Sequence, residues 1–116
     1  MNKLDTPVNS MGAFQLTYKK LIIGILRFEQ GNWYFEYSTE FKSQKPITPI
    51  IDFPDVEKKY QSDQLWPFFA ARIPNLNQPF HEKKITTANI NRKDAVSLLK
   101  VFGRDTITNP FQLLSL

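Results

Sequence analysis

The stretch LIIGILRFEQGNWYFEY, residues 21–37, contains two runs rich in β-branched and aromatic residues. Gly31 and Asn32 separate the two runs, and both residues tolerate a positive φ angle. A pair of this kind between two β-prone runs is typical of a hairpin turn. We therefore expect two antiparallel strands that meet at this turn.

Further strands are predicted on both sides of this hairpin. Upstream, apolar residues alternate with polar ones over residues 13–18. Downstream, Pro46 and Pro49 lie in an isoleucine-containing segment, and proline cannot donate a ladder hydrogen bond. This segment is expected to be an edge strand or an extended connector. A last strand is predicted from about Phe111, after Pro110.

Two helices are predicted in the second half of the chain. The first is expected to begin at Ser62 and Asp63, because these capping residues precede apolar residues at intervals of three and four, and Pro74 ends it. The second is expected to begin with Asn91 as its N-cap and to end at Gly103, which would adopt a positive φ angle.

Two segments are predicted to lack regular structure. Residues 52–61 are expected to form a polar loop, and residues 75–89 a long irregular loop with at most a short strand near Ile85. Strands and helices do not alternate regularly along the chain. The predicted fold class is therefore α+β, with an antiparallel, strongly curved sheet of about five strands and two main helices packed on it.

The length of 116 residues is typical of one domain. We expect a flexible leader over residues 1–12 and a folded domain over residues 13–116. The chain contains no cysteine, which excludes disulfides and thiolate metal sites and favours a cytoplasmic location. The polar start of the chain and the absence of a long apolar run predict no membrane contact.

The net charge of +4 raises the question of nucleic-acid binding. Lysine and arginine residues are spread along the chain among acidic residues, which favours a solvated surface over a phosphate-binding stripe. The prediction is therefore no direct contact with nucleic acid. Binding of RNA or DNA through the basic surface and exposed aromatic residues remains a third alternative.

Sequence motifs for catalysis are missing. The single histidine, His81, has no neighbouring nucleophile or second metal ligand at a useful spacing. The four glycines are isolated, so no phosphate-binding loop can be built, and the kinase motifs H-R-D and D-F-G are absent. We predict no catalytic residue, no metal and no cofactor, and hence a binding protein.

Five consecutive bulky residues, LWPFF at positions 65–69, are the most informative feature for function. They cannot all point into one core from the start of a helix. The spacing predicts that Leu65, Phe68 and Phe69 are core residues and that Trp66 is exposed. Tryptophan is a preferred anchor at protein interfaces. The alternative is that Trp66 completes the core.

The order of these signals resembles the N-terminal subdomain of HipA-family serine/threonine kinases. The most specific part is LWPFFAARIP at residues 65–74, and the hairpin and the helix that ends at Gly103 extend the resemblance over nearly the whole chain. One departure is Asn75, which follows Pro74 where HipA proteins usually continue with Leu-Pro-Glu-Gly.

Because the chain ends at Leu116, where a kinase would continue into its catalytic core, it looks like a HipS-type antitoxin of HipBST systems. The resemblance implies two partners, a HipT-like kinase toxin and a HipB-like DNA-binding protein, in a ternary complex. It also implies that Trp66 reaches into the kinase active site, with Pro67 stiffening its base and Phe69 and Arg72 forming the surrounding contact surface. The alternative is a structural subunit that bridges kinase and HipB-like repressor without inhibition.

Overall fold

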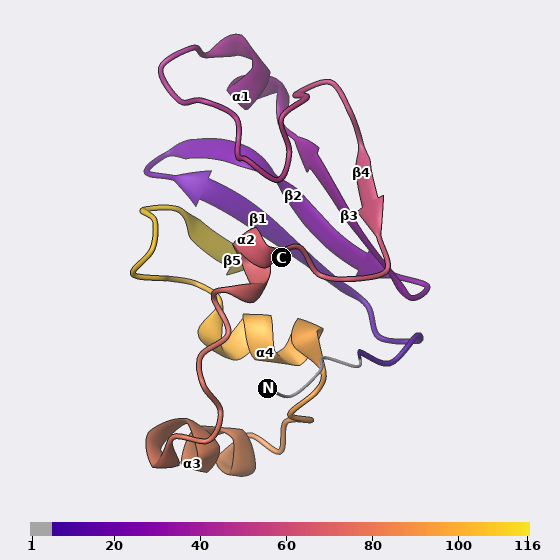
Figure 1. Ribbon diagram of the computed structural model, residues 1–116, viewed down its shortest axis with the longest axis vertical. Helices are drawn as coiled ribbons and strands as arrows, with labels where there is room; N and C mark the ends of the chain where they lie inside the picture. The colour runs from indigo at the N-terminus through magenta and orange to yellow at the C-terminus, as the bar shows by residue number, and fades with distance from the viewer. Residues whose placement is uncertain (1–5) are drawn as a thin grey trace.

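The computed structural model describes residues 6–116, which form a five-stranded antiparallel sheet and four helices (Figure 1). The strands lie in the order β4-β3-β2-β1-β5. Their bounds are Gly12–Tyr18 for β1, Leu21–Glu29 for β2, Asn32–Tyr37 for β3, Tyr60–Ser62 for β4 and Gln112–Ser115 for β5. The helices span Thr39–Ser43 for α1, Pro67–Ala70 for α2, Pro79–Thr87 for α3 and Ala95–Phe102 for α4. The predicted α+β class is confirmed.

The predicted hairpin is confirmed, with its turn shifted by one residue. Positive φ angles of 51° and 82° fall on Gln30 and Gly31, whereas Asn32 already pairs with Glu29 across the two strands. A two-residue turn in which both central residues have positive φ matches the twist of the strands that it joins. Strands β1, β2 and β3 consequently pair antiparallel along most of their length.

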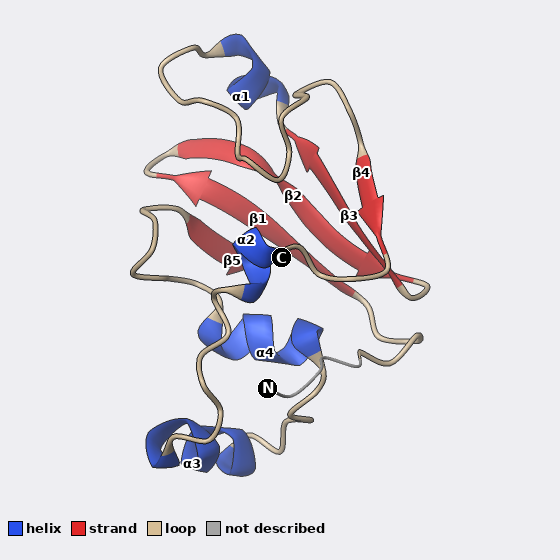
Figure 2. Ribbon diagram, viewed as in Figure 1, coloured by secondary structure: helices blue, strands red, loops and turns tan. Residues whose placement is uncertain are grey.

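The hydrophobic core lies on one face of the sheet. Phe14, Leu26 and Phe35 occupy neighbouring positions on adjacent strands, and their side chains are buried. Helices α2 and α4 contribute buried residues to the same cluster, and Figure 2 shows α2 overlapping the strands and α4 below them. Burial of the aromatic and aliphatic residues of this cluster supplies apolar area that stabilises the domain.

The first predicted helix begins later than expected, and the predicted polar loop ends in a strand. Ser62 is not a helix cap but belongs to β4, where it pairs with Trp33, and α2 begins at Pro67. Proline suits this first helical position because its missing N–H would have no partner there. Pairing with β3 therefore overrides the local capping signal of Ser62 and Asp63.

The prediction of an irregular loop over residues 75–89 is wrong, because α3 lies there. Pro79 occupies its first turn, and Ile85 packs with Leu76 and Leu98 in a small second cluster of buried residues. The other residues of α3 are mostly polar, so the sequence shows no apolar stripe. The structure also contains α1, which the sequence analysis did not predict and which Ser38 caps through the backbone N–H of Phe41.

Helix α4 is confirmed, but both of its predicted ends need correction. Its N-cap is Asp94 and not Asn91, because the Asp94 carboxylate accepts hydrogen bonds from two backbone N–H groups of the first turn. At the other end, Gly103 has a φ angle of −83° and not the predicted positive value. A Cβ atom at Gly103 would lie 2.6 Å from the carbonyl oxygen of Leu99, so close packing favours glycine there.

The predicted leader falls partly outside the described residues, which exclude positions 1–5. Within the described part, the hydroxyl of Thr6 accepts a hydrogen bond from the backbone N–H of Ala95 at 3.0 Å. Strand β1 already begins at Gly12. Of the remaining predictions, the segment containing Pro46 and Pro49 forms a connector and not a strand, and the last strand, β5, is confirmed.

Candidate functional site

Trp66 lies at the start of the short helix α2, where it is the N-cap residue. Its carbonyl oxygen accepts hydrogen bonds from the backbone N–H groups of Phe69 and Ala70, at 3.0 and 2.9 Å. Its side chain is half-buried, and Pro67 beside it is exposed. The bulky residues at the start of α2 therefore divide between core and surface, and Trp66 takes an intermediate position.

The Trp66 ring packs on a cluster of aromatic side chains in the core. The ring meets the edge of Phe53 with a centroid distance of 4.9 Å and an interplanar angle of 79°. Phe53 is fully buried and stacks on Phe35 of β3 at 4.3 Å, and it also contacts Phe69 at 5.9 Å. Edge-to-face contacts of this kind fix the relative orientation of aromatic rings. The position of Trp66 thus depends on the sheet beneath it.

A carboxylate from a distant segment caps the N-terminus of α2. The Trp66 side chain makes no capping hydrogen bond itself. Instead, Oδ2 of Asp52 accepts a hydrogen bond from the backbone N–H of Phe68 at 3.0 Å. A negative charge at the start of a helix is stabilised by the unpaired N–H groups and by the helix dipole. Asp52 therefore joins the connector between α1 and β4 to the helix that carries Trp66.

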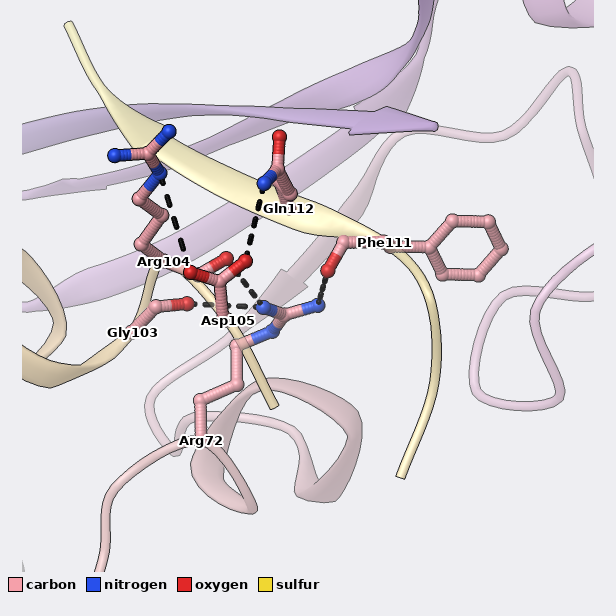
Figure 3. Close-up of polar contacts among 6 residues, drawn as sticks. All are labelled: Arg72, Gly103, Arg104, Asp105, Phe111 and Gln112. Atoms are coloured by element: carbon pink, nitrogen blue, oxygen red, sulfur yellow. Dashed lines mark hydrogen bonds and ion pairs between the residues drawn. The ribbon is translucent and has the colours of Figure 1, made fainter. Parts of the chain in front are cut away.

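Arg72 follows α2, and its guanidinium group ties this segment to the end of the chain (Figure 3). The side chain is only 3% exposed. Nη1 donates to the carbonyl oxygens of Gly103 and Arg104 at 2.9 and 3.2 Å. Nη2 donates to Oδ1 of Asn109 at 3.2 Å and to the carbonyl oxygen of Phe111 at 3.0 Å. This set of hydrogen bonds connects the exit of α2 with the approach to β5.

The interior position of Arg72 has an electrostatic cost. Burial lowers the pKa of the guanidinium to about 10, because the charged form loses its hydration, and the nearby charge of Asp105 partly opposes this change. The Nε atom of Arg72 is buried and has no hydrogen-bond partner among residues 6–116. The four hydrogen bonds of the other two nitrogens offset part of the cost of burying the charge. Arg72 is therefore a structural anchor of α2.

The structure separates the four predicted site residues into two groups. Pro67 is exposed and Trp66 is partly buried, whereas Phe69 and Arg72 are buried and support α2 from within. The core position that the spacing predicts for Phe69 is confirmed, and the place on the contact surface that the resemblance implies for Phe69 and Arg72 is wrong. Partner binding by these residues stays a prediction.

Sequence reasoning missed Asp52 as part of this site. It lies 16 residues before Phe68 in the segment that was predicted to be a polar loop, and no sequence spacing links the two residues.

A groove of about 1030 Å³ borders the other side of α2. Leu65, Pro67 and Ile73 line it from the α2 side, and Trp33 and Leu76 line it from the sheet and from the segment before α3. Pro67 thus lines this groove, and Trp66 is not among its lining residues.

The described residues include no group of three or more histidine, aspartate or glutamate side chains that could hold a metal ion. His81 lies on α3, where its ring contacts Phe102 at a centroid distance of 5.4 Å. None of the helices within residues 6–116 is long and apolar enough to cross a membrane.

The geometry defines a class of protein, namely a small α+β domain that carries a partly buried tryptophan at the start of a short, firmly anchored helix. The family model of the HipA N-terminal domain matches residues 14–108, which is most of the chain. The chain therefore belongs to the HipA N-terminal domain family. The resemblance found in the sequence is confirmed.

A solved structure described as the N-terminal domain of HipA toxin is similar to this chain. The TM-score is 0.60 at 19% sequence identity, and the match covers 100% of this chain and 97% of that chain. At this identity the likeness demonstrates the shared fold. HipA is a toxin, and this family context fits a toxin–antitoxin system. No curated protein sequence matches the chain significantly.

Proposed function

We propose that this chain binds a HipA-like serine/threonine kinase and inhibits it as a HipS-type antitoxin, with Trp66 inserted at the kinase active site. The observation that carries the proposal is the placement of Trp66. Its partly buried ring packs on the buried ring of Phe53 at the start of a helix that Asp52 and Arg72 hold from both ends. Membership in the HipA N-terminal domain family supports the choice of partner.

Inhibition by an inserted side chain requires no chemistry from this chain. Phosphoryl transfer depends on the positions of the nucleotide phosphates, the metal ions and the catalytic carboxylate, so a displacement of about 1 Å is enough to slow it strongly. A tryptophan that is already held in place loses little side-chain entropy on binding. Pro67 further restricts the backbone next to Trp66. A tryptophan held rigidly at the start of α2 is therefore well suited to block the kinase active site.

A second candidate function is a structural one, in which the chain bridges the kinase to a HipB-like DNA-binding protein without blocking the active site. The observation in its favour is Phe80 on α3, whose side chain is 74% exposed. Helix α3 lies at the end of the molecule opposite to α1 (Figure 1). It thus offers an apolar contact remote from the connector that supports Trp66.

The test measures autophosphorylation of the HipA-like kinase with and without this protein, for the wild type and for Trp66→Ala. Phe80→Ala is the matched control, because it also removes an accessible aromatic side chain. Loss of the phosphorylation signal with the wild type and with Phe80→Ala, and its return with Trp66→Ala, is the expected result. Equal inhibition by the wild type and Trp66→Ala would contradict insertion of Trp66. Binding of the kinase without any inhibition would favour the bridging function.

A further inference from the structure

The connector between α1 and β4 contains a rigid turn with the sequence PIIDFP, residues 49–54. The backbone N–H of Phe53 donates to the carbonyl oxygen of Ile50 at 2.8 Å, which closes the turn. The hydroxyl of Tyr37, on β3, donates to the carbonyl oxygen of Phe53 at 2.7 Å and accepts from the N–H of Ile50 at 2.9 Å. One tyrosine thus fixes both ends of the turn to the sheet.

The side chains of this turn divide sharply between interior and solvent. Ile50 and Phe53 are buried in the main core, whereas Ile51 between them is 94% exposed. Pro49 and Pro54, which flank the turn, are also exposed. The prolines and the three hydrogen bonds restrict the backbone before any partner binds. Ile51 is consequently an exposed apolar side chain on a turn whose backbone is fixed by hydrogen bonds.

This turn is joined directly to the helix that carries Trp66. Asp52 accepts the hydrogen bond from the N–H of Phe68 at 3.0 Å, and the ring of Phe53 supports Trp66 at 4.9 Å. Figure 1 shows the connector reaching from α1 toward α2. Ile51 therefore lies one residue from the carboxylate that caps α2 and two residues from the ring that supports Trp66.

We propose that Ile51 is a second contact residue for the kinase, and that the turn at residues 49–54 and the start of α2 form one continuous apolar contact surface. The inference rests on the proposed function, because the partner is the kinase that Trp66 enters. An apolar side chain on a rigid support gains hydrophobic stabilisation on burial at a small entropic cost. The kinase region that covers Ile51 is expected to be apolar and to adjoin the pocket that receives Trp66.

Ile107 offers a contrast within the same chain. It is also fully exposed, but it follows Thr106 and precedes Thr108 in a polar segment between α4 and β5. Its link to α2 runs through Asn109, which accepts from Arg72 at the exit of the helix and not at the start that carries Trp66. Exposure alone therefore does not single out Ile51, and its connection to the start of α2 does.

The experiment measures the affinity of the full chain for the HipA-like kinase by isothermal titration calorimetry, for the wild type, Ile51→Ser and Ile107→Ser. We expect Ile51→Ser to weaken binding about ten-fold or more, and Ile107→Ser to leave it within about two-fold of the wild type. Ile51→Leu is expected to retain most of the affinity, since it keeps the apolar surface. Thermal unfolding of each variant checks that the fold is preserved.

The outcomes separate the two proposals. If the wild type binds the kinase and Ile51→Ser binds equally well, the inference about Ile51 is overturned and the role of Trp66 stands. If Ile51→Ser and Ile107→Ser weaken binding to the same extent, the contact is not specific to the turn, and the inference is overturned as well. If the wild type does not bind the kinase at all, the proposed function fails and the inference fails with it.

Discussion

Helices α2 and α4 pack on the same face of the sheet, but they are held in different ways. Helix α4 has eight residues, and its cap, Asp94, directly precedes it. Helix α2 has four residues and depends on Asp52, which lies 16 residues before Phe68, and on the contacts that Arg72 makes 31 to 39 residues further along the chain. A short helix with few internal hydrogen bonds needs such support.

The two helices differ in which contacts fix their positions. The capping of α4 is mostly local, since Asp94 supplies it, and the hydroxyl of Thr6 adds one distant hydrogen bond at Ala95. The geometry of α2, and with it the position of Trp66, reflects contacts with β3, with the connector after α1 and with the segment before β5. Trp66 is thus carried by α2, a helix whose position depends on contacts with distant parts of the chain.

The largest expected effect comes from Arg72→Ala. This change removes four hydrogen bonds, to three carbonyl oxygens and to Oδ1 of Asn109, and only Arg104 and Asn109 keep a second donor, so the free energy of unfolding should fall by about 3 kcal/mol or more. Denaturant titration measures the change. Arg104→Ala is the control, because this side chain is exposed and its ion pair with Asp105, at 4.0 Å, should contribute less than about 1 kcal/mol. Equal effects of the two variants would contradict the anchoring role of Arg72.

Tyr37→Phe should have the next largest effect. It removes the donor to the carbonyl oxygen of Phe53 and the acceptor for the N–H of Ile50, at an expected cost of about 2 kcal/mol in the free energy of unfolding. Because the turn at residues 49–54 supports Trp66, inhibition of the kinase should also weaken. A Tyr37→Phe variant with unchanged stability would show that the turn holds its shape without this hydroxyl.

The same tyrosine predicts a pH dependence of stability. Burial raises the pKa of Tyr37 to about 12, whereas the ordinary value in the unfolded chain is 10.0. Above pH 10.0 the unfolded chain loses this proton first, so stability should fall by at most about 1.4 kcal/mol for each pH unit up to about 12. Unfolding midpoints of the wild type and Tyr37→Phe at about pH 8 and about pH 11 test this, and the wild type should lose more than the variant.

On α4, Asp94→Ala should lower the free energy of unfolding by about 1 kcal/mol, because two backbone N–H groups of the first turn lose their acceptor. Asn91→Ala is the matched control, since the side chain of Asn91 is exposed and accepts only from the N–H of Lys93. Thermal unfolding followed by circular dichroism distinguishes the two. A greater loss of stability with Asn91→Ala than with Asp94→Ala would indicate that Asn91, the residue predicted from the sequence, is the N-cap of α4.

The smallest effect on stability is expected from Asp52→Ala, at less than about 1 kcal/mol, because a single hydrogen bond is lost. The effect on the position of Trp66 should be larger than this value suggests. In a Trp33→Phe background Trp66 is the only tryptophan, and its fluorescence should become more accessible to acrylamide when Asp52 is replaced. Unchanged quenching would show that the aromatic cluster alone fixes Trp66.

The comparison of the two helices also explains which predictions succeeded. The hairpin of β2 and β3 and the apolar face of α4 are short-range patterns, and the sequence predicted both. The short strand β4 was missed, since its three residues are polar or aromatic and follow a lysine pair, and only pairing with β3 makes them a strand. Helix α3 was missed because Ile85 is its one buried residue, which leaves no periodic pattern.

For the site, the sequence showed that residues 65–69 carry more bulky side chains than one core can take, and it predicted the buried Phe69, but the structure leaves Leu65, Trp66 and Phe68 equally in a partly buried class. The sequence also indicated the family, because residues 65–74 form a specific motif. The internal anchoring by Arg72, the capping of α2 by Asp52 and the exposure of Ile51 follow from the tertiary structure alone. The physical reason is that hydrogen bonds between residues far apart in the chain depend on how the sheet and the connectors bring those residues together, and no local periodicity records that arrangement.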